Sequence, residues 1–502
     1  MSYRLDVFSG VGLNEARLTL ALDGRRAREL PRLEKLWSYF RNPLEPVGVG
    51  GAIGSTRRGW YRQAQETGLP DRVTGARRDP ALDDRAGGRR EVVIENDIAW
   101  RVQLMVDFLF GKPIRILSTS ADERTRESIE LAIEAVWEAS GGIALLQDIA
   151  TLGHVYGHVD LAVRIDEDRL LRARTGDVAA IAEAIRIEPV DARRGFGFMD
   201  RDDYRELDAY AICVERESTP RAGAQSERQR RLRGGRRAAR RESAARDRVL
   251  SLELIGPGVR QVYEDGLLAE ESRSVLLPET LPIVHVQNMS QPFVYTGLSE
   301  VESLIPLQDE LNTRLSDRAS RVTLQSFQMY LAKGIDGFDR APVGPGALWQ
   351  TDNPDASVQA FGGDAASPSE SAHIEEIREA MDKVSAAPPI AGGVLRGRIG
   401  NLSSATALRV TLIGLLAKTD RKRVTYGRGI ADASRIVLEA LDAAGVLRTS
   451  AGDRGVRVAW SDPLPTEERD DIAAARAKVE LGVESERVMS ELGYEATDPS
   501  IR

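Results

Sequence analysis

Cysteine, aromatic residues and long apolar runs are scarce in this sequence, and each scarcity excludes a class of protein. The 502 residues include a single cysteine, Cys213, so neither an internal disulfide framework nor a cysteine-rich zinc site can form. Aromatic residues make up 5% of the chain, too few for a base-stacking platform that binds single strands. No stretch approaches the roughly 18 apolar residues of a membrane span, and MSYRLDVFSGVG at the N-terminus lacks a signal-peptide core. We therefore expect a soluble protein made in a reducing cytoplasm.

The chain has a negative net charge outside one short basic run. The net charge is 69 − 77 = −8, whereas residues 227–248 hold ten arginines against three acids, 10 − 3 = +7, so the remainder carries −8 − 7 = −15. Tight DNA binding depends on basic side chains that displace counterions, so the body is not built to hold DNA statically. We interpret the run RRLRGGRRAARR as a solvated insertion between strands. Its basic residues are Arg230, Arg231, Arg233, Arg236, Arg237, Arg240 and Arg241.

The candidate catalytic and metal-binding motifs are weak. His154 and His158 stand four apart, but glycines flank them and the adjacent valines alternate as in a strand, so strand-edge histidines are favoured over a metal site. GVGGAIGS (48–55) resembles a dinucleotide loop, but prolines occupy the place of the preceding strand. No GxxxxGK[ST] motif is present. The sequence therefore offers no persuasive enzyme.

Two acidic clusters leave metal-dependent DNA cleavage open as an alternative. We interpret the first as a polar turn and the second as the first turn of a helix, where acids favour the dipole. The clusters are Asp200, Asp202 and Asp203, and Glu467, Glu468, Asp470 and Asp471.

Hydrophobic periodicity predicts an α+β chain. A loop over 42–90 is expected to be partly disordered. Helices are predicted at 30–40, 94–110, 122–139, 143–152, 371–384, 403–444, 466–481 and 485–492. Strands are predicted at 114–117 and 456–460, and those at 155–165, 210–215, 249–254 and 261–263 in one mixed sheet.

The middle of the chain has an unusual order. Ser299 and Glu302 form an S-x-x-E capping box, which predicts a helix of about thirty residues kinked at Pro306. A small β module (329–362), a helix, the irregular AAPPIAGGVLRGRIGN and the long helix follow. Helices this long have little compact domain to cover them, so we expect them to pack in an oligomer of identical subunits.

Four segments together resemble the portal proteins of tailed bacteriophages. They are NDIAWRVQLMVDFLFGKPI (96–114), GLSEVESLIPLQDELN (297–312), SSATALRVTLIGLLAKTDRK (403–422), and the closing VRVAWSDPLPTEERDD with GVESERVMSEL. Their order and spacing agree with that family over about residues 91–495; residues 1–90 and the Arg-rich run lie outside the resemblance.

The resemblance implies a portal fold of wing, stem, clip and crown, assembled as a ring with a central channel. Residues 1–90 would be an N-terminal segment, partly disordered or at the wing periphery. The other parts would be a wing (91–296, with insertion 226–248), a stem helix (297–328), the clip (329–365), a second stem helix (366–385), the tunnel loop (386–402), a long wing helix (403–445), and a C-terminal wing strand with crown helices (446–502).

The resemblance also implies a function that is mechanical. Such rings, usually of about twelve subunits, form the unique capsid vertex of the virion and let double-stranded DNA pass during packaging and ejection. Expected partners are the terminase large subunit, a head–tail adaptor, and the major capsid or scaffolding protein. No cofactor, metal, catalytic residue or membrane is implied.

The expected site residues follow from that scheme. Arg396, Arg398 and Asn401 would lie in the tunnel loop, and Arg409 and Lys418 would form ion pairs between subunits. The clip residues expected to contact terminase or adaptor are Lys333, Asp336, Asp339, Arg340 and Asp352. A smaller connector or adaptor ring protein, and a non-viral protein that binds DNA through the Arg-rich run, remain alternatives.

Overall fold

The computed structural model describes residues 3–46, 61–74, 91–203, 205–217, 248–325, 329–333, 354–361, 368–392, 405–464 and 468–482, with residues 485 and 488. The glycine-rich stretch 48–55, the Arg-rich run 230–241 and the helix predicted at 485–492, apart from those two residues, lie outside it. None of the described helices has both the length and the apolar character needed to cross a membrane.

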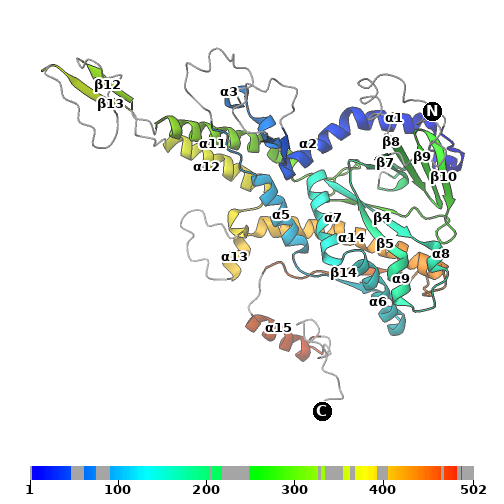
Figure 1. Ribbon diagram of the computed structural model, residues 1–502. Coiled ribbons are helices and arrows are strands. Elements are labelled where there is room, and N and C mark those ends of the chain that lie inside the picture. Colours follow the sequence, from blue (N-terminus) through cyan, green and yellow to red (C-terminus); the bar gives the residue numbers. More distant parts are fainter. Residues whose placement is uncertain are drawn as a thin grey trace, which may run out of the picture.

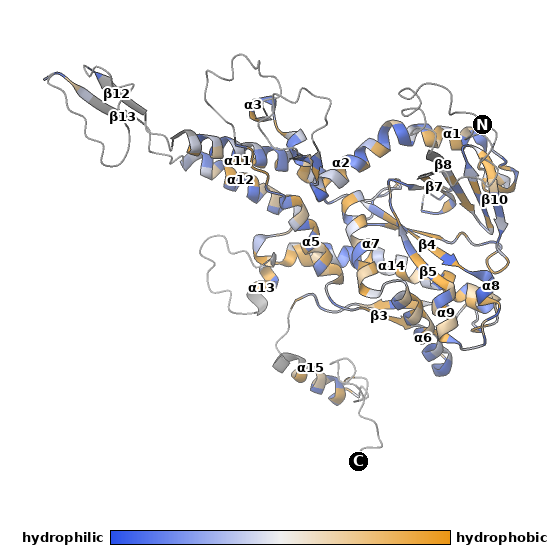
Figure 2. Cartoon of the chain, viewed as in Figure 1, coloured by the Kyte–Doolittle hydropathy of each residue, from blue (hydrophilic) through white to orange (hydrophobic). Residues whose placement is uncertain are grey.

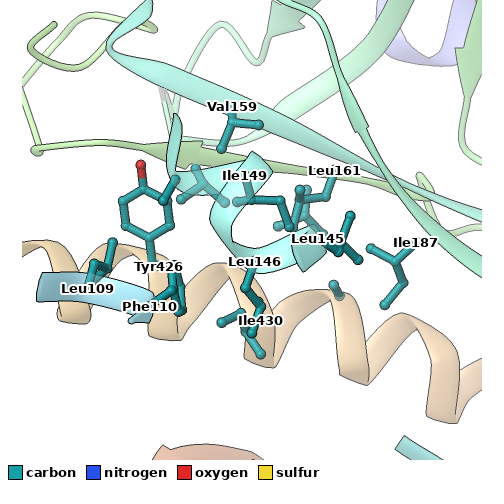
Figure 3. Close-up of a cluster of buried hydrophobic side chains, with 14 of the residues drawn as sticks. Leu109, Phe110, Leu145, Leu146, Ile149, Val159, Leu161, Ile187, Tyr426 and Ile430 are labelled. Carbon is teal, nitrogen blue, oxygen red and sulfur yellow. The ribbon is translucent and has the colours of Figure 1, made fainter. Parts of the chain in front are cut away.

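A three-stranded antiparallel sheet forms the centre of the body, in the order β11 (Ile283–Gln287), β4 (His158–Ile165), β5 (Ile185–Val190). Helix α7 (Gly142–Tyr156) packs on it, and the long helix α14 (Ile413–Ala443) packs on both. Figure 3 shows the resulting core, in which Ile149 of α7 lies between Val159 of β4 and Ile430 of α14.

A second antiparallel sheet is buried on both faces at its centre, whereas its edge strand β10 (Leu267–Arg273) is largely exposed. The strand order is β10, β9 (Val259–Glu264), β8 (Arg248–Gly256), β7 (Leu207–Glu217), β6 (Gly195–Met199). Because side chains alternate along a strand, Ala211 faces the N-terminal Phe8 and Leu18, whereas Tyr210 faces Ala162 of the central sheet.

Some of the remaining elements pack against these sheets and others lie apart from them (Figure 1). Asn96 and Asp122 accept hydrogen bonds from Ala99 N and Thr125 N, so they cap the helices that follow. The elements are α1 (Glu15–Gly24), a π-helical turn (Arg25–Glu29), α2 (Leu30–Arg41), β1 (Leu44–Pro46), β2 (Tyr61–Gln63), α3 (Asp71–Thr74), α5 (Asp97–Phe110), β3 (Arg115–Ser118), α6 (Glu123–Ala139), α8 (Glu167–Leu170), α9 (Val178–Ala184), α13 (Ala405–Thr411), β14 (Val456–Ala459), which pairs with β3, and α15 (Glu468–Glu480).

Two helices project side by side from the body, α11 (Ile305–Gln325) and α12 (Pro368–Ser385), and we call them the helix pair (Figure 1). Buried Ile374, Ile377 and Met381 of α12 belong to one core cluster with Leu311 of α11. Strands β12 (Met329–Lys333) and β13 (Ser357–Phe361) form an antiparallel hairpin at the far end. Hydrophilic residues cover much of the outer surface of the pair (Figure 2).

One polar row of α11 holds an incoming segment of the chain. Side-chain oxygens of four α11 residues, spaced four apart and so on one helix face, accept hydrogen bonds from backbone N–H groups of residues 91–98. The pairs are Ser320 with Glu91 N (3.0 Å), Ser316 with Val93 N (3.0 Å), Asn312 with Glu95 N (3.0 Å) and Gln308 with Ile98 N (3.2 Å). These four backbone N–H groups therefore have partners although the segment is not part of a sheet.

Several element predictions need correction. The strands predicted as one mixed sheet belong to two antiparallel sheets, and residues 155–156 end helix α7 instead of starting a strand. Residues 44–46, 61–68 and 71–74 of the predicted loop form regular structure. Ser299 does cap Val301 and Glu302, but Glu302 binds Arg32 instead of closing the box. A 3-10 turn (Glu302–Leu304) precedes α11, so Pro306 falls in the first turn of that helix, where proline is tolerated.

Replacing Asn312 by alanine should lower the free energy of unfolding by about 2–4 kcal/mol, because several buried polar groups then lose their partner. Asn312 accepts from Glu95 N and from Gln308 Nε2, and its amide donates to Gln65 at 3.0 Å. Urea unfolding of the purified protein measures the change. Arg318→Ala on the exposed side of the same helix is the control, and an equal loss in both variants would contradict this role for the polar row.

Candidate functional site

The site lies where α12 ends and the segment predicted as the tunnel loop begins. Ala386, directly after the helix, has a left-handed backbone (φ 55°), a conformation that costs a non-glycine residue about 1 kcal/mol. Pro388 and Pro389 follow and cannot continue a helix. A 3-10 turn (Pro389–Gly392) then packs close to Trp100 of α5. The end of α12 is therefore fixed by its own sequence and by the body beneath it.

Arg101 of α5 holds this end through a fully buried guanidinium. Its Nη1 donates to Ser385 Oγ (2.8 Å) and to the Ala387 carbonyl (2.9 Å), and its Nη2 donates to Asp382 Oδ1 (2.6 Å). Asp97, one turn earlier in α5, accepts from Nε at 2.9 Å. The planar fork of arginine can serve four acceptors at once, so α5 and the last turn of α12 are joined through a single side chain.

A second buried ion cluster approaches Ser385 from α14. Lys418 Nζ donates to Glu300 Oε2 (2.5 Å) and to the Ser385 carbonyl (2.8 Å). Lys422, one turn further along, places Nζ 2.8 Å from Glu300 Oε1. The backbone N–H of Glu300 donates to the His154 carbonyl (2.8 Å). We call Arg101, Glu300, Ser385, Lys418 and Lys422 the junction.

Burial and charge shift the pKa values at the junction in ways that follow from its composition. Burial alone would raise the pKa of Glu300, but the ammonium groups of Lys422 and Lys418 lower it to about 2. Burial lowers the pKa of Lys422 to about 8, even though Glu300 opposes this. Lys418 and Lys422 share the single carboxylate of Glu300. The ammonium group of Lys422 is therefore the one that loses its proton more easily.

The exposed side of α12 carries a row of acids above the junction. Glu375 and Glu376 are more than half exposed, and Glu379 one turn later is also exposed. The nearest basic side chains are Arg378, 3.3 Å from Glu375, and His373, whose ring lies 3.4 Å from Glu376. Such exposed contacts are weak, so this side of the helix pair keeps a negative potential.

Most of the residues predicted from the family resemblance fall outside the described ranges. Arg396, Arg398 and Asn401 of the tunnel loop, the arginines of the 230–241 run, and Asp336, Asp339, Arg340 and Asp352 of the clip all lie there. Lys333 is described and exposed, at the end of β12, where it pairs with Ser357 of β13. The expected roles of these residues stay predictions.

Two cations that were predicted to pair between subunits have partners within the chain. Lys418 is buried against Glu300, and Arg409 contacts Asp462 at 2.5 Å. Arg409 is exposed beside Asp462, so its pairing between subunits stays a prediction. Lys418 in fact lies on the face of α14 that packs on the body, together with Leu415 and Lys422, so its ion pair is internal.

The residues of the weaker motifs make hydrogen bonds or lie inside helices and strands. His154 lies inside α7 with Nδ1 2.5 Å from the Ala150 carbonyl, and His158 begins the central strand β4, so neither is at a strand edge. Asp200 accepts from the backbone of Asp202 and Asp203 in a polar turn. Within the described ranges no three histidine, cysteine or acidic side chains are grouped so as to hold a metal ion.

Arg101, Glu300 and Ser385 were not identified from the sequence as a site. Arg101 follows Ile98 by one helical turn and precedes Met105 by another, so it lies on the apolar face of α5. Lys418 and Lys422 likewise alternate with Leu415 and Tyr426 on the apolar face of α14. Charges at core positions are the signal that predicts a buried ion cluster, although their partners come from distant parts of the chain.

A family model matches the C-terminal part of the chain. Residues 268–493 match the family model described as "Phage portal protein, SPP1 Gp6-like", so the resemblance to phage portal proteins is confirmed over this part of the chain. No curated protein matches the chain.

Two solved structures show a weak similarity to this chain. One is a chain from the neck of an empty gene transfer agent particle (TM-score 0.44, 13% identity, 84% of this chain and 95% of that chain covered). The other is from the virion of a native gene transfer agent particle (TM-score 0.40, 13% identity, 85% and 100% covered).

Replacing Glu300 by glutamine should lower the free energy of unfolding by about 3–5 kcal/mol, since two buried ammonium groups lose their counterion. Urea unfolding at neutral pH measures the loss. Asp420→Asn on α14, the helix that carries Lys418 and Lys422, is the matched control: this carboxylate is exposed and lies 3.7 Å from Arg423, so the change should be about 0.5 kcal/mol or less. Similar losses in both variants would contradict the junction.

Lys422 should make stability rise with pH in the alkaline range. Its pKa falls from 10.5 to about 8 on folding, so between these values the unfolded chain binds a proton that the folded chain lacks. The unfolded state then binds more protons, and the free energy of unfolding increases with pH through this group. Unfolding measured across this window should show the rise in the wild type and a smaller one in Lys422→Met. Identical slopes would refute the assignment.

Proposed function

We propose that this chain is the subunit of a phage portal, a ring at the unique capsid vertex through which double-stranded DNA passes during packaging and ejection. The observation that carries the proposal is the family match of residues 268–493. This range includes the helix pair, its terminal hairpin, the junction residues Glu300, Ser385, Lys418 and Lys422, and α14.

In this proposal the parts of the chain keep the roles of the family. The helix pair is the stem, the segment around β12 and β13 is the clip, and residues 386–402 are the tunnel loop. The body with α14 is the wing, and α15 belongs to the crown. One side of α12 is exposed to solvent, and neighbouring stems in a ring would cover part of that surface.

The charge distribution supports a channel through which DNA slides. A surface that binds phosphates strongly would hold DNA in place, whereas exposed Glu375, Glu376 and Glu379 on α12 repel it. We place this row on the channel side of the stem. Arg396 and Arg398 of the tunnel loop would then make the few contacts with the phosphate backbone.

The partners follow from the same scheme. The sequence has no GxxxxGK[ST] motif, so a separate terminase ATPase supplies the energy, docking on the clip around Lys333, Asp336, Asp339, Arg340 and Asp352. A head–tail adaptor takes that place after packaging. The wing, with its Arg-rich insertion, faces the capsid or scaffolding protein, and the assembled ring is part of the virion.

The native mass of the purified full-length protein, with negative-stain images, tests the proposal. We expect a ring with a central hole at about twelve times the subunit mass. Because ring closure depends on concentration, the measurement is repeated on concentrated protein. A monomer that persists there would contradict the portal function.

A further inference from the structure

Helix α6 has an exposed face on which acids flank one apolar side chain. Glu127, Leu131 and Glu134 are spaced by four and then three residues, so they lie on one helix face. All three are exposed, and Leu131 retains 57% of its surface. Within the described part of the chain, no cation lies within ion-pair distance of Glu127 or Glu134. The face is acidic, with an apolar centre.

Helix α14 has the opposite pattern on its own exposed face. Arg421, Val424 and Arg428 are spaced by three and then four residues, and Val424 retains 72% of its surface. The Arg428 side chain is 78% exposed and lies 3.8 Å from Asp432, a distant contact. Asp420, beside Arg421, is directed to Arg423 at 3.7 Å. The face is basic, again with an apolar centre.

The spacings of the two faces match when the helices run antiparallel. At 1.5 Å per residue, three residues span about 4.5 Å and four span about 6 Å. With Val424 opposite Leu131, Arg421 lies level with Glu134 and Arg428 level with Glu127. The two apolar side chains then cover each other, and both ion pairs form beside a contact from which water is excluded.

One subunit cannot make this contact with itself. Its α6 and α14 already pack through other faces, where the buried Trp137 donates from Nε1 to Ser434 Oγ at 3.2 Å. Arg421 is thirteen residues from Ser434, about 20 Å along the helix axis. Each copy of the chain therefore offers one acidic and one basic face that only another copy can match.

We propose that the Glu127–Leu131–Glu134 face of α6 binds the Arg421–Val424–Arg428 face of α14 on a neighbouring copy of this chain. The two faces differ, so the contact is head-to-tail, and an open row of bound copies still has one unmatched face at each end. Contacts of this kind close into rings when the rotation permits. The inference rests on the proposed function for the closed ring and adds the residues that join its subunits.

Charge reversal tests the contact with two double variants. Glu127→Arg with Glu134→Arg makes both faces basic, and Arg421→Glu with Arg428→Glu makes both acidic. Each variant alone should assemble at least about tenfold more weakly than the wild type, because like charges then face each other. An equimolar mixture should recover assembly, with the two variants alternating. Native mass and sedimentation as a function of concentration measure both results.

Mixing also separates the contact from a folding defect, because a misfolded variant would not be rescued by its partner. The matched control reverses Glu264 and Arg273, exposed on β9 and β10 of the other sheet, and should assemble like the wild type. Double variants that form the wild-type ring would overturn the contact and leave the portal function standing. A wild-type chain that never assembles would overturn both.

Discussion

Six charged side chains meet where the helix pair joins the body, and they can be buried together only because their charges cancel. An unpaired charge in the interior costs several kcal/mol, whereas a matched set with complete hydrogen bonding is tolerated. Three cations face three carboxylates, 3 − 3 = 0. They are Arg101, Lys418 and Lys422 with Asp97, Glu300 and Asp382. Ser385 links the two halves, because its hydroxyl accepts from Arg101 and its carbonyl accepts from Lys418.

These ion pairs fix the orientation of the helix pair relative to the body, which apolar packing alone would not define. Hydrophobic contacts tolerate sliding, but a guanidinium with four acceptors has one position. Arg101 belongs to α5, Lys418 to α14, Ser385 to α12, and Glu300 to the segment before α11. The projecting helices therefore take their direction from the body. The polar row on α11 extends the same principle along the first helix, where side-chain oxygens hold the segment 91–98.

Local patterns in the sequence predicted the elements but not their partners. Helices 122–139 and 371–384 were predicted to within a few residues, since caps and apolar periodicity are local signals. The two antiparallel sheets were merged because strand pairing depends on contacts remote in sequence. Lys418 was predicted to pair with a neighbouring subunit for a similar reason: its counterion Glu300 is 118 residues away. Positions on the apolar faces of α5 and α14 were the available signal, and only the fold supplies the acceptors.

Buried charges in the described part of this chain are paired, whereas many exposed charges are not, and this difference bears on function. Inside, every cation of the junction has a carboxylate partner. On the surface, the acids of α12 have only weak contacts, and the faces of α6 and α14 carry opposite charges that stay apart within one subunit. Unmatched exposed charge adds nothing to the stability of a monomer. Its arrangement into one acidic row and two complementary faces instead fits a subunit whose surfaces meet DNA on one side and its own copies on the others.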